Sequence, residues 1–379
     1  AVRVRPWRVA GQSAGRTTAI LDGGFRARSI GPAQNGGRIH EIEALGSDPS
    51  TIYVAAAGGG LWKTADAGIT WKPIFDHEGT STFGDVAISP SNPQIVWAGT
   101  GEQNQRQSTS WGDGVYRSTN GGESWTHLGL VNTRHIGKIA AHPTNPDVAW
   151  VAALGNLWAP SADRGVFKTT DGGRTWEKVL YVDTLTGAVD VVIDPADPNT
   201  LFAATYQRMR QPWGFSGGGP GSGLHKSTDG GRTWRPITRG LPPGEKGRIG
   251  IAISRSNPRV MNVIVESEPS TQGVYRSEDG GESWAKMSNL NPRPSYYSNI
   301  FIDPLNDQRV YVMSGSDRSE DGGRTWSEFG AAPTYDVGVH SDHHALWIDP
   351  RDTKHIFLGN DGGLYETWDR GLHFRKLDQ

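Results

Sequence analysis

Residues 165–176 read GVFKTTDGGRTW, and this twelve-residue pattern occurs seven times along the 379-residue chain with modest variation. Most copies contain a glycine, an aromatic and a basic residue, then Ser or Thr, then Asp, and they end in Ser or Thr followed by Trp. The acidic or amide position is filled by Asp66, Asn120, Asp171, Asp229, Asp279, Asp321 and Asp369. These positions lie 42 to 58 residues apart, and an internal repeat of this period is typical of propellers and solenoids.

The repeated Asp has a structural explanation. Its carboxylate can accept backbone N–H groups within a tight turn, and the glycine that follows can adopt a positive φ. The aromatic residue at the end, which is Trp in six copies and Phe374 in the last, is suited to bury a large apolar surface between neighbouring sheets. We therefore expect the seven side chains to shape turns rather than to form a catalytic array.

The segments between the copies predict pairs of short strands. Residues 137–154, 189–206 and 345–359 each contain two runs rich in β-branched and aromatic residues, separated by a turn with proline. The repeat then supplies a third strand, the Asp turn and a fourth strand. The sequence therefore predicts an all-β, seven-bladed β-propeller with four-stranded antiparallel blades and the Asp turns between strands three and four.

The composition excludes several classes of function. The formal net charge is −2, so no overall positive field favours nucleic acid. Cysteine is absent, which excludes thiolate metal sites and cysteine nucleophiles. No run of eighteen apolar residues predicts a membrane span. The chain begins at Ala1 without Met, which favours a secreted or periplasmic protein, and no cofactor is expected.

The repeat resembles the Asp-box, or bacterial neuraminidase repeat, of sialidases, xyloglucan-degrading hydrolases, sortilin-type receptors and photosystem II assembly propellers. Residues 25–39, 101–118, 207–224 and 340–350 further resemble bacterial sortilin-like proteins that carry a glycosyl hydrolase label. Such proteins usually have a second propeller, so the resemblance implies a second propeller or a larger assembly as partner. Within this chain we expect a tail over residues 1–24 and one propeller over residues 25–379. Both 25–30 and 374–377 are typical of a fourth strand.

Ligands are expected on the face opposite the Asp turns, where strands two and three are joined. Three of these joins are long, at residues 101–113, 154–164 and 206–222, and loops on a rigid β scaffold commonly carry function. The glycine-rich residues 214–223 are typical of a flexible rim or lid. Arginine suits carboxylates or sulfates, and Trp and Tyr suit sugar rings. The candidate ligand-binding residues are Arg38, His40, Arg106, Trp111, Asp113, His135, Tyr206, Arg208, Arg210, Trp213, Arg248, Tyr297 and His344.

The candidate catalytic residues are Glu102, Asp342 and His343. Glycoside hydrolysis requires two carboxyl groups, and the same face also carries Asp85, Asp113, Asp190, Glu266, Glu268 and Asp361, so the sequence selects no pair. The metal state stays unknown, because neighbouring strand residues such as His343 and His344 point to opposite faces. Two hypotheses remain: a sortilin-like propeller that binds a peptide, a partner protein or a glycan in its central funnel, or a glycoside hydrolase or lyase acting on an acidic or plant-type polysaccharide.

Overall fold

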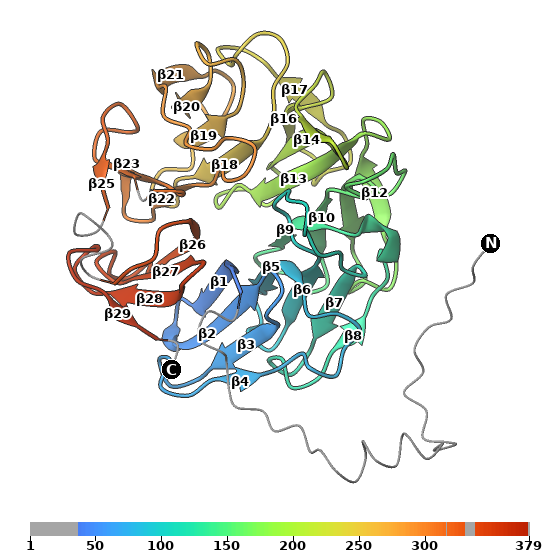
Figure 1. Ribbon diagram of the computed structural model, residues 1–379, viewed down its shortest axis with the longest axis vertical. Coiled ribbons are helices and arrows are strands. Elements are labelled where there is room, and N and C mark those ends of the chain that lie inside the picture. The colour runs from blue at the N-terminus through green and yellow to red at the C-terminus, as the bar shows by residue number, and fades with distance from the viewer. Residues whose placement is uncertain (1–36, 316, 330–337, 378–379) are drawn as a thin grey trace. The chain divides into compact units, whose positions relative to one another are not determined.

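Seven antiparallel sheets surround a central axis in the computed structural model of the chain (Figure 1). The structure describes residues 37–315, 317–329 and 338–377. Each sheet is formed by strands that follow one another in the chain, with the first strand next to the axis. The predicted all-β propeller of seven four-stranded blades is therefore confirmed. The predicted tail over 1–24 and the strand over 25–30 lie outside the described residues.

The first four blades cover residues 39–237. Blade 1 contains β1 (Ile39–Leu45), β2 (Asp48–Ala56), β3 (Leu61–Thr64) and β4 (Lys72–Pro73). Blade 2 contains β5 (Phe83–Ile88), β6 (Val96–Thr100), β7 (Val115–Ser118) and β8 (Thr126–His127), followed by the short 3-10 helix η1 (Val131–Thr133). Blade 3 contains β9 (Ile136–Ala141), β10 (Ala149–Ala153), β11 (Gly165–Thr169) and β12 (Glu177–Leu180). Blade 4 contains β13 (Thr186–Ile193), β14 (Leu201–Gln211), β16 (Gly223–Ser227) and β17 (Arg235–Ile237), with β15 (Gly214–Gly217) paired to β14.

The last three blades complete the ring. Blade 5 contains β18 (Ile249–Ile253), β19 (Met261–Val265), β20 (Gly273–Ser277) and β21 (Ala285–Ser288). Blade 6 contains β22 (Ile300–Asp303), β23 (Asn306–Val312), β24 (Asp317–Ser319) and β25 (Ser327–Glu328). Blade 7 contains β26 (His343–Ile348), β27 (Ile356–Asn360), β28 (Gly363–Thr367) and β29 (Arg375–Lys376).

The repeated Asp holds the turn between the third and fourth strands, as predicted. In blade 3, Asp171 Oδ1 accepts the Thr175 N–H at 3.0 Å and the Thr169 hydroxyl at 2.9 Å, while Asp171 Oδ2 accepts the Thr175 hydroxyl at 2.7 Å. Thr169 Oγ1 in turn accepts the N–H of Gly173, whose φ of +91° is one that glycine adopts without strain. The carboxylate is thus engaged by three hydrogen bonds within its own turn, as a structural role requires.

In blades 1, 2 and 3, the Trp that ends the turn bonds to the preceding blade of the ring. Trp125 Nε1 donates to Ile74 O at 2.7 Å, and Trp176 Nε1 donates to Leu128 O at 2.8 Å. Trp71 Nε1 donates to Leu377 O at 3.1 Å, which joins blade 1 to blade 7. All four strands of blade 7 come from one continuous segment, so side-chain packing across this seam closes the ring.

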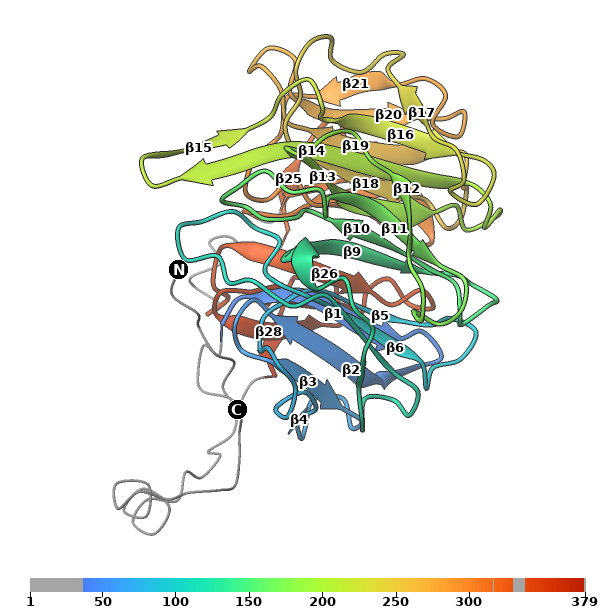
Figure 2. The same ribbon diagram turned by 90° about the vertical axis from the view of Figure 1, so that its right-hand side faces the viewer.

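The prediction of a flexible rim over residues 214–223 is wrong for its first part. Strand β14 continues beyond the blade and pairs with β15 in the register Arg208↔Gly217 and Arg210↔Phe215. The Arg210 guanidinium lies 5.1 Å from the centroid of the Phe215 ring. Figure 2 shows this two-stranded ribbon projecting past the other strands of its blade. Ladder pairing and the Arg–Phe contact outweigh the low strand propensity of glycine.

Candidate functional site

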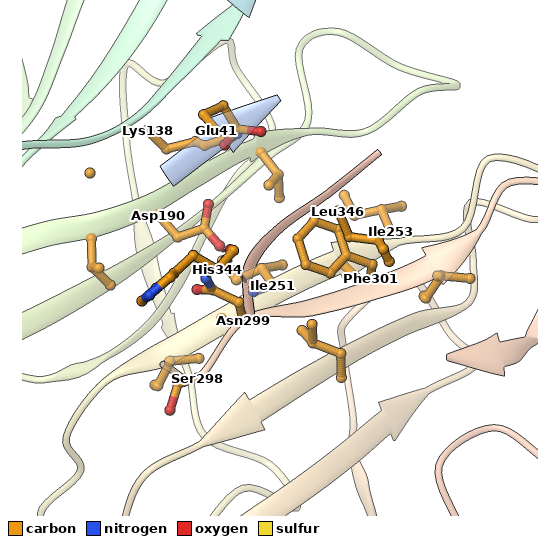
Figure 3. A pocket seen from close by; sticks show the side chains of 18 of the residues that line it. Glu41, Lys138, Asp190, Ile251, Ile253, Ser298, Asn299, Phe301, His344 and Leu346 are labelled. Carbon is orange, nitrogen blue, oxygen red and sulfur yellow. Dashed lines mark hydrogen bonds and ion pairs between the residues drawn. The ribbon is translucent and has the colours of Figure 1, made fainter. Parts of the chain in front are cut away.

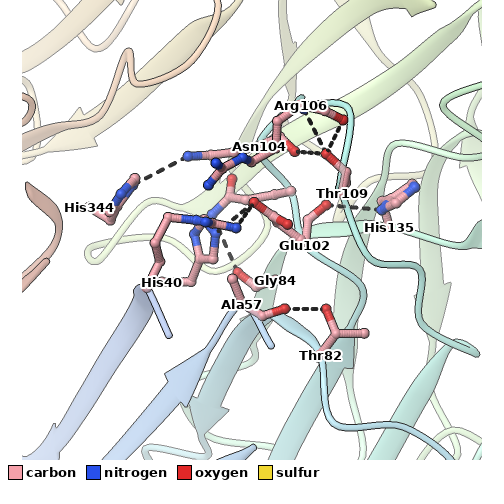
Figure 4. A network of polar contacts seen from close by, with 12 residues as sticks. His40, Ala57, Thr82, Gly84, Glu102, Asn104, Arg106, Thr109, His135 and His344 are labelled. Carbon is pink, nitrogen blue, oxygen red and sulfur yellow. Dashed lines mark hydrogen bonds and ion pairs between the residues drawn. The ribbon is translucent and has the colours of Figure 1, made fainter. Parts of the chain in front are cut away.

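The loop after β6 lies on the face opposite the Asp turns, because it joins strands two and three of its blade. We call residues 101–107 the axial loop, and Figure 4 shows some of its polar contacts. Glu102 lies in its buried part, where Arg38 NH2 donates to Glu102 Oε1 at 2.5 Å and His40 Nε2 lies 3.8 Å from the same oxygen. His135 Nδ1 donates to the backbone carbonyl of Glu102 at 2.9 Å. Burial acts to raise the pKa of Glu102, but His40 and Arg38 outweigh it and leave that pKa below its usual value.

The next residues of the axial loop contact blades 4 and 5. Arg248 NH2 donates to Gln103 Oε1 at 2.8 Å, and Arg248 NH1 donates to Asn104 Oδ1 at 3.2 Å. Arg208 NH1 donates to the Gln103 carbonyl at 2.6 Å, and Arg210 NH2 donates to the side chain of Gln105. These three arginines were predicted to meet a ligand, and in the structure they hold the loop across the mouth of the channel.

Beneath the axial loop the channel widens into a cavity of about 290 Å³, which we call the axial chamber (Figure 3). One wall is charged, because Lys138 Nζ lies 2.8 Å from Glu41 Oε2 and 2.9 Å from Asp85 Oδ1. Asp190 extends this wall. The opposite wall is apolar and is formed by side chains from β18, β22 and β26, including Ile251, Ile253, Phe301 and Leu346.

A larger cavity of about 610 Å³ lies beside the axial loop, and we call it the loop-face cleft. Its carboxyl groups are Glu266, Asp342 and Asp361, and its aromatic side chains are Tyr296 and Tyr297. Glu266 directly follows β19 of blade 5, and Asp361 lies in the turn between β27 and β28 of blade 7. Segments from blades 2, 4, 5 and 7 and the connection before blade 6 therefore meet at one cavity.

Asp342 is held by two donors within the cleft. The Tyr297 hydroxyl donates to Asp342 Oδ1 at 2.5 Å, and Arg293 NH1 donates to the same oxygen at 2.9 Å. Asp342 has a φ of +67°, a left-handed conformation that Asp tolerates better than most residues. Burial and the neighbouring Asp342 carboxylate raise the pKa of Tyr297, so its hydroxyl stays protonated and acts as a donor.

The other two carboxyl groups of the cleft have opposite electrostatic surroundings. Burial raises the pKa of Glu266, although Glu266 Oε2 accepts the Arg248 N–H at 2.7 Å. Burial also acts to raise the pKa of Asp361, but the hydrogen bond from His344 Nε2 to Asp361 Oδ1, at 2.9 Å, and the charges of His344, Arg38 and His340 together outweigh it. The pKa of Asp361 is therefore lowered. The surroundings thus shift the pKa of one carboxyl group upward and the pKa of the other downward.

The structure separates the predicted site residues into three groups. Arg106, Arg210, Tyr297 and Asp342 line the loop-face cleft. A second group contacts the axial loop without lining this cleft: Arg38, His40, His135, Arg208, Arg248 and His344. Glu102 belongs to the loop, as Arg106 does, and Arg210 contacts it as well. The remaining five residues line neither cavity. His343 and Tyr206 are buried, with His343 Nδ1 3.3 Å from Asn360 Nδ2, and Asp113 accepts the Tyr116 hydroxyl. Trp111 and Trp213 are 58% and 82% exposed.

Sequence reasoning did not name Gln103, Gln105, Arg293 or Tyr296. The sequence did contain one signal that could have indicated the two glutamines, which is the run of three amide side chains at residues 103–105 within the longest loop of blade 2. Within the described ranges, no group of three or more His, Asp or Glu side chains is arranged to hold a metal ion. No helix among those residues is long and apolar enough to cross a membrane.

Comparison with known proteins places the chain among propellers. The family model Sortilin-Vps10, described as sortilin, neurotensin receptor 3, matches residues 113–243. A xyloglucanase of Paenibacillus sp is 28% identical over 250 residues, which is 66% of this chain and 21% of that protein. A xyloglucanase of Acetivibrio thermocellus is 23% identical over 368 residues, 87% of this chain and 38% of that protein. The chain thus spans well under half of each relative.

A solved structure shares the fold. The crystal structure of a xyloglucanase from Xanthomonas campestris superposes with a TM-score of 0.66 at 18% sequence identity, over 92% of this chain and 55% of that one. At this identity the likeness shows the propeller architecture alone.

Proposed function

We propose that this propeller is a glycoside hydrolase that acts on a neutral, plant-type β-glucan in the loop-face cleft. Glu266 is the candidate general acid, and Asp361 is the candidate base. The similarity to xyloglucanases over most of the chain supports this proposal against a purely binding role. Because such polysaccharides lie outside cells, we further propose that the protein works outside the cytoplasm.

The observation that carries the proposal is the pair of carboxyl groups with opposite pKa shifts in one cavity. A glycoside hydrolase needs one carboxyl group that stays protonated to donate to the leaving oxygen and another that stays ionised. Burial favours the protonated form of Glu266, and the hydrogen bond from His344 favours the charged form of Asp361. The half-buried ring of Tyr296 beside them offers an apolar face to a sugar ring.

Two of the three arginines of the cleft are already engaged by protein groups, which favours a neutral glycan over an acidic one. Arg293 pairs with Asp342, and Arg210 donates to Gln105. Among the described residues, Arg106 is then the one guanidinium of the cleft with no hydrogen bond or ion pair to another side chain. A ligand carboxylate would have to compete with Asp342 for Arg293, whereas sugar hydroxyl groups can donate to the carboxylates already present.

The test is release of reducing ends from tamarind-type xyloglucan and from an unsubstituted mixed-linkage β-glucan, with polygalacturonate as the acidic comparison. We expect turnover on a neutral glucan and a loss of about 10²- to 10⁴-fold in Glu266→Gln and Asp361→Asn. Turnover is expected to fall as pH rises above the raised pKa of Glu266, because the general acid is then deprotonated.

Glu268→Gln is the matched control, because Glu268 is exposed two residues beyond Glu266 and does not line the cleft. It should retain the parent activity. A folded parent protein without turnover on any neutral glucan would contradict the hydrolase proposal.

The second candidate function is binding without turnover, of a glycan, a peptide or a partner protein. Two of the predicted catalytic carboxylates favour this function, because Glu102 and Asp342 each form an ion pair with an arginine and are therefore not free for catalysis. Saturable binding of xyloglucan oligosaccharides without cleavage would support it. A second propeller or a larger assembly stays a prediction, and size measurement in solution is its test.

A further inference from the structure

The hydrogen bonds around the axial loop have a direction that begins at Arg248. A guanidinium has only donors, so the Asn104 atom that faces Arg248 must be the carbonyl oxygen Oδ1. The Asn104 amide nitrogen then lies 3.3 Å from His344 Nδ1. Because an amide nitrogen can only donate, His344 Nδ1 must accept.

The proton of His344 therefore lies on the other ring nitrogen. In a neutral imidazole one nitrogen donates and the other accepts, so Nε2 carries the proton and donates to Asp361 Oδ1 at 2.9 Å. A doubly protonated ring would set the Nδ1 proton against the Asn104 amide hydrogens.

The neighbours of His344 agree with a neutral ring. Burial, the largest cause, lowers the pKa of His344 to about 4, and only the bond to Asp361 acts strongly in the other direction. The titratable groups that face it from the packed elements are Asp361, Tyr296, Tyr297, His40 and Arg38.

We propose that Asn104 and His344 are positioning residues of a one-way hydrogen-bond relay, Arg248 to Asn104 to His344 to Asp361, which fixes Asp361 as an acceptor for ligand hydroxyl groups. The relay itself depends only on the contacts described. The part of the proposal that concerns a ligand, in which Asp361 accepts hydrogen bonds from its hydroxyl groups, rests on the proposed function. Through this relay the axial loop, which belongs to blade 2, is connected to a carboxylate of blade 7.

The test is the proton position on His344, measured from ¹⁵N shifts and long-range proton couplings in protein labelled at histidine. We expect His344 to carry its proton on Nε2. His135 is an internal reference with the opposite tautomer, because its Nδ1 faces the Glu102 carbonyl and must donate. A proton on Nδ1 of His344 in the parent protein would overturn the relay, without any variant.

Asn104→Asp reverses the relay, because a carboxylate at this position accepts instead of donating. We expect the His344 proton to move to Nδ1, or the ring to become doubly protonated, while the His135 signals stay unchanged. An unchanged His344 tautomer would overturn the proposal.

The ligand part is read from titration with a xyloglucan oligosaccharide. We expect Asn104→Asp to weaken binding about 3- to 10-fold, the size of one lost hydrogen bond, and to shift its pH dependence. The expected tautomer with no glycan binding would leave the relay standing and reject the proposed function. Unchanged affinity and pH dependence in Asn104→Asp would reject the ligand part of the relay.

Discussion

A single carboxylate organises each turn between the outer strands. In blade 5, Asp279 Oδ1 accepts the Ser277 hydroxyl at 2.8 Å and the Ser283 N–H at 2.9 Å, and Oδ2 accepts the Ser283 hydroxyl at 2.5 Å. Blade 2 has an amide instead, and there Asn120 Nδ2 donates to Ser124 Oγ at 2.9 Å. The turn therefore requires an acceptor at the Oδ1 position of this residue. At the position of the second side-chain atom, which is Oδ2 in Asp and Nδ2 in Asn, it tolerates an acceptor or a donor.

Asp279→Ala should lower the free energy of unfolding by about 1 kcal/mol, since several bonds are lost but solvent replaces part of them. Asp279→Asn should cost clearly less, because the Ser283 hydroxyl can reverse its role as Ser124 does. Urea denaturation of the two variants checks this. Equal losses in both variants would show that the amide of Asn120 is not a valid precedent.

The same carboxylate predicts a response to acid. Burial acts to raise the pKa of Asp279, but the bonds from Ser283 dominate and lower it from 3.8 to about 2. A group with a lower pKa in the folded state stabilises the fold above its unfolded pKa. That stabilisation is lost as pH falls from about 4 to about 2. Asp279→Asn should therefore show a smaller loss of stability over this window, as measured by urea denaturation at several pH values.

At the scale of the element, the basic residue of the third strand connects neighbouring blades. Lys168 Nζ donates to Gly230 O at 2.7 Å, and Lys226 Nζ donates to Gly280 O at 2.7 Å. Each acceptor lies in the turn of the next blade. The basic position of the repeat, which the sequence displays without an evident reason, is thus an inter-blade contact.

Lys168→Met keeps an unbranched apolar side chain and removes the ammonium group, which lies 5.2 Å from the centroid of the Trp150 ring. We expect a loss of about 1 kcal/mol in the free energy of unfolding, because the charged hydrogen bond to the carbonyl of Gly230 and the contact of the ammonium group with Trp150 both disappear. Lys354→Met is the control, since Lys354 is exposed. Unfolding both variants with guanidinium chloride measures their free energies of unfolding. An equal loss at the two positions would exclude the inter-blade role.

For the whole molecule, the seam between blades 1 and 7 is distinctive, because no direct chain connection crosses it within the described ring. Trp71 bonds to Leu377 O, and Arg351 NH1 donates to Ser47 O at 3.1 Å. Beneath these bonds, Ile42 and Val54 belong to one apolar cluster with Phe357. The energy of closure is therefore non-covalent, and most of it comes from apolar burial.

Trp71→Ala should open this seam locally. We expect a stability loss of about 2 kcal/mol or more and faster hydrogen exchange in β1 and β26, because a large ring is removed from the seam. Trp125→Ala removes an equivalent ring from the interface of blades 1 and 2, where the chain itself links the blades. In Trp125→Ala we expect the strands at that interface to exchange their amide hydrogens only through global unfolding. Identical exchange patterns in the two variants would show that the seam has no separate opening.

The fold could be predicted because each blade repeats the same local chemistry. The Asp, the glycine and the Trp of residues 165–176 specify a turn and a wedge by contacts within one blade or with its neighbour. The site could not be predicted in the same way. Arg208 and Arg248 have the residue type and face expected for ligand binding, but the long-range contacts of the axial loop engage them. Glu266 and Asp361 were two among many carboxylates on that face.

The sequence by itself determined the number of blades, their strand content and the position of the turns, because these follow from short-range hydrogen bonds and apolar periodicity. Only the tertiary structure decided which polar groups meet. Residues 102–105 contact side chains from as far away as His344, and such pairing depends on closure of the ring. The tertiary structure also decided the opposite pKa shifts of Glu266 and Asp361, since burial and the hydrogen bond between His344 and Asp361 within blade 7 are properties of the folded chain.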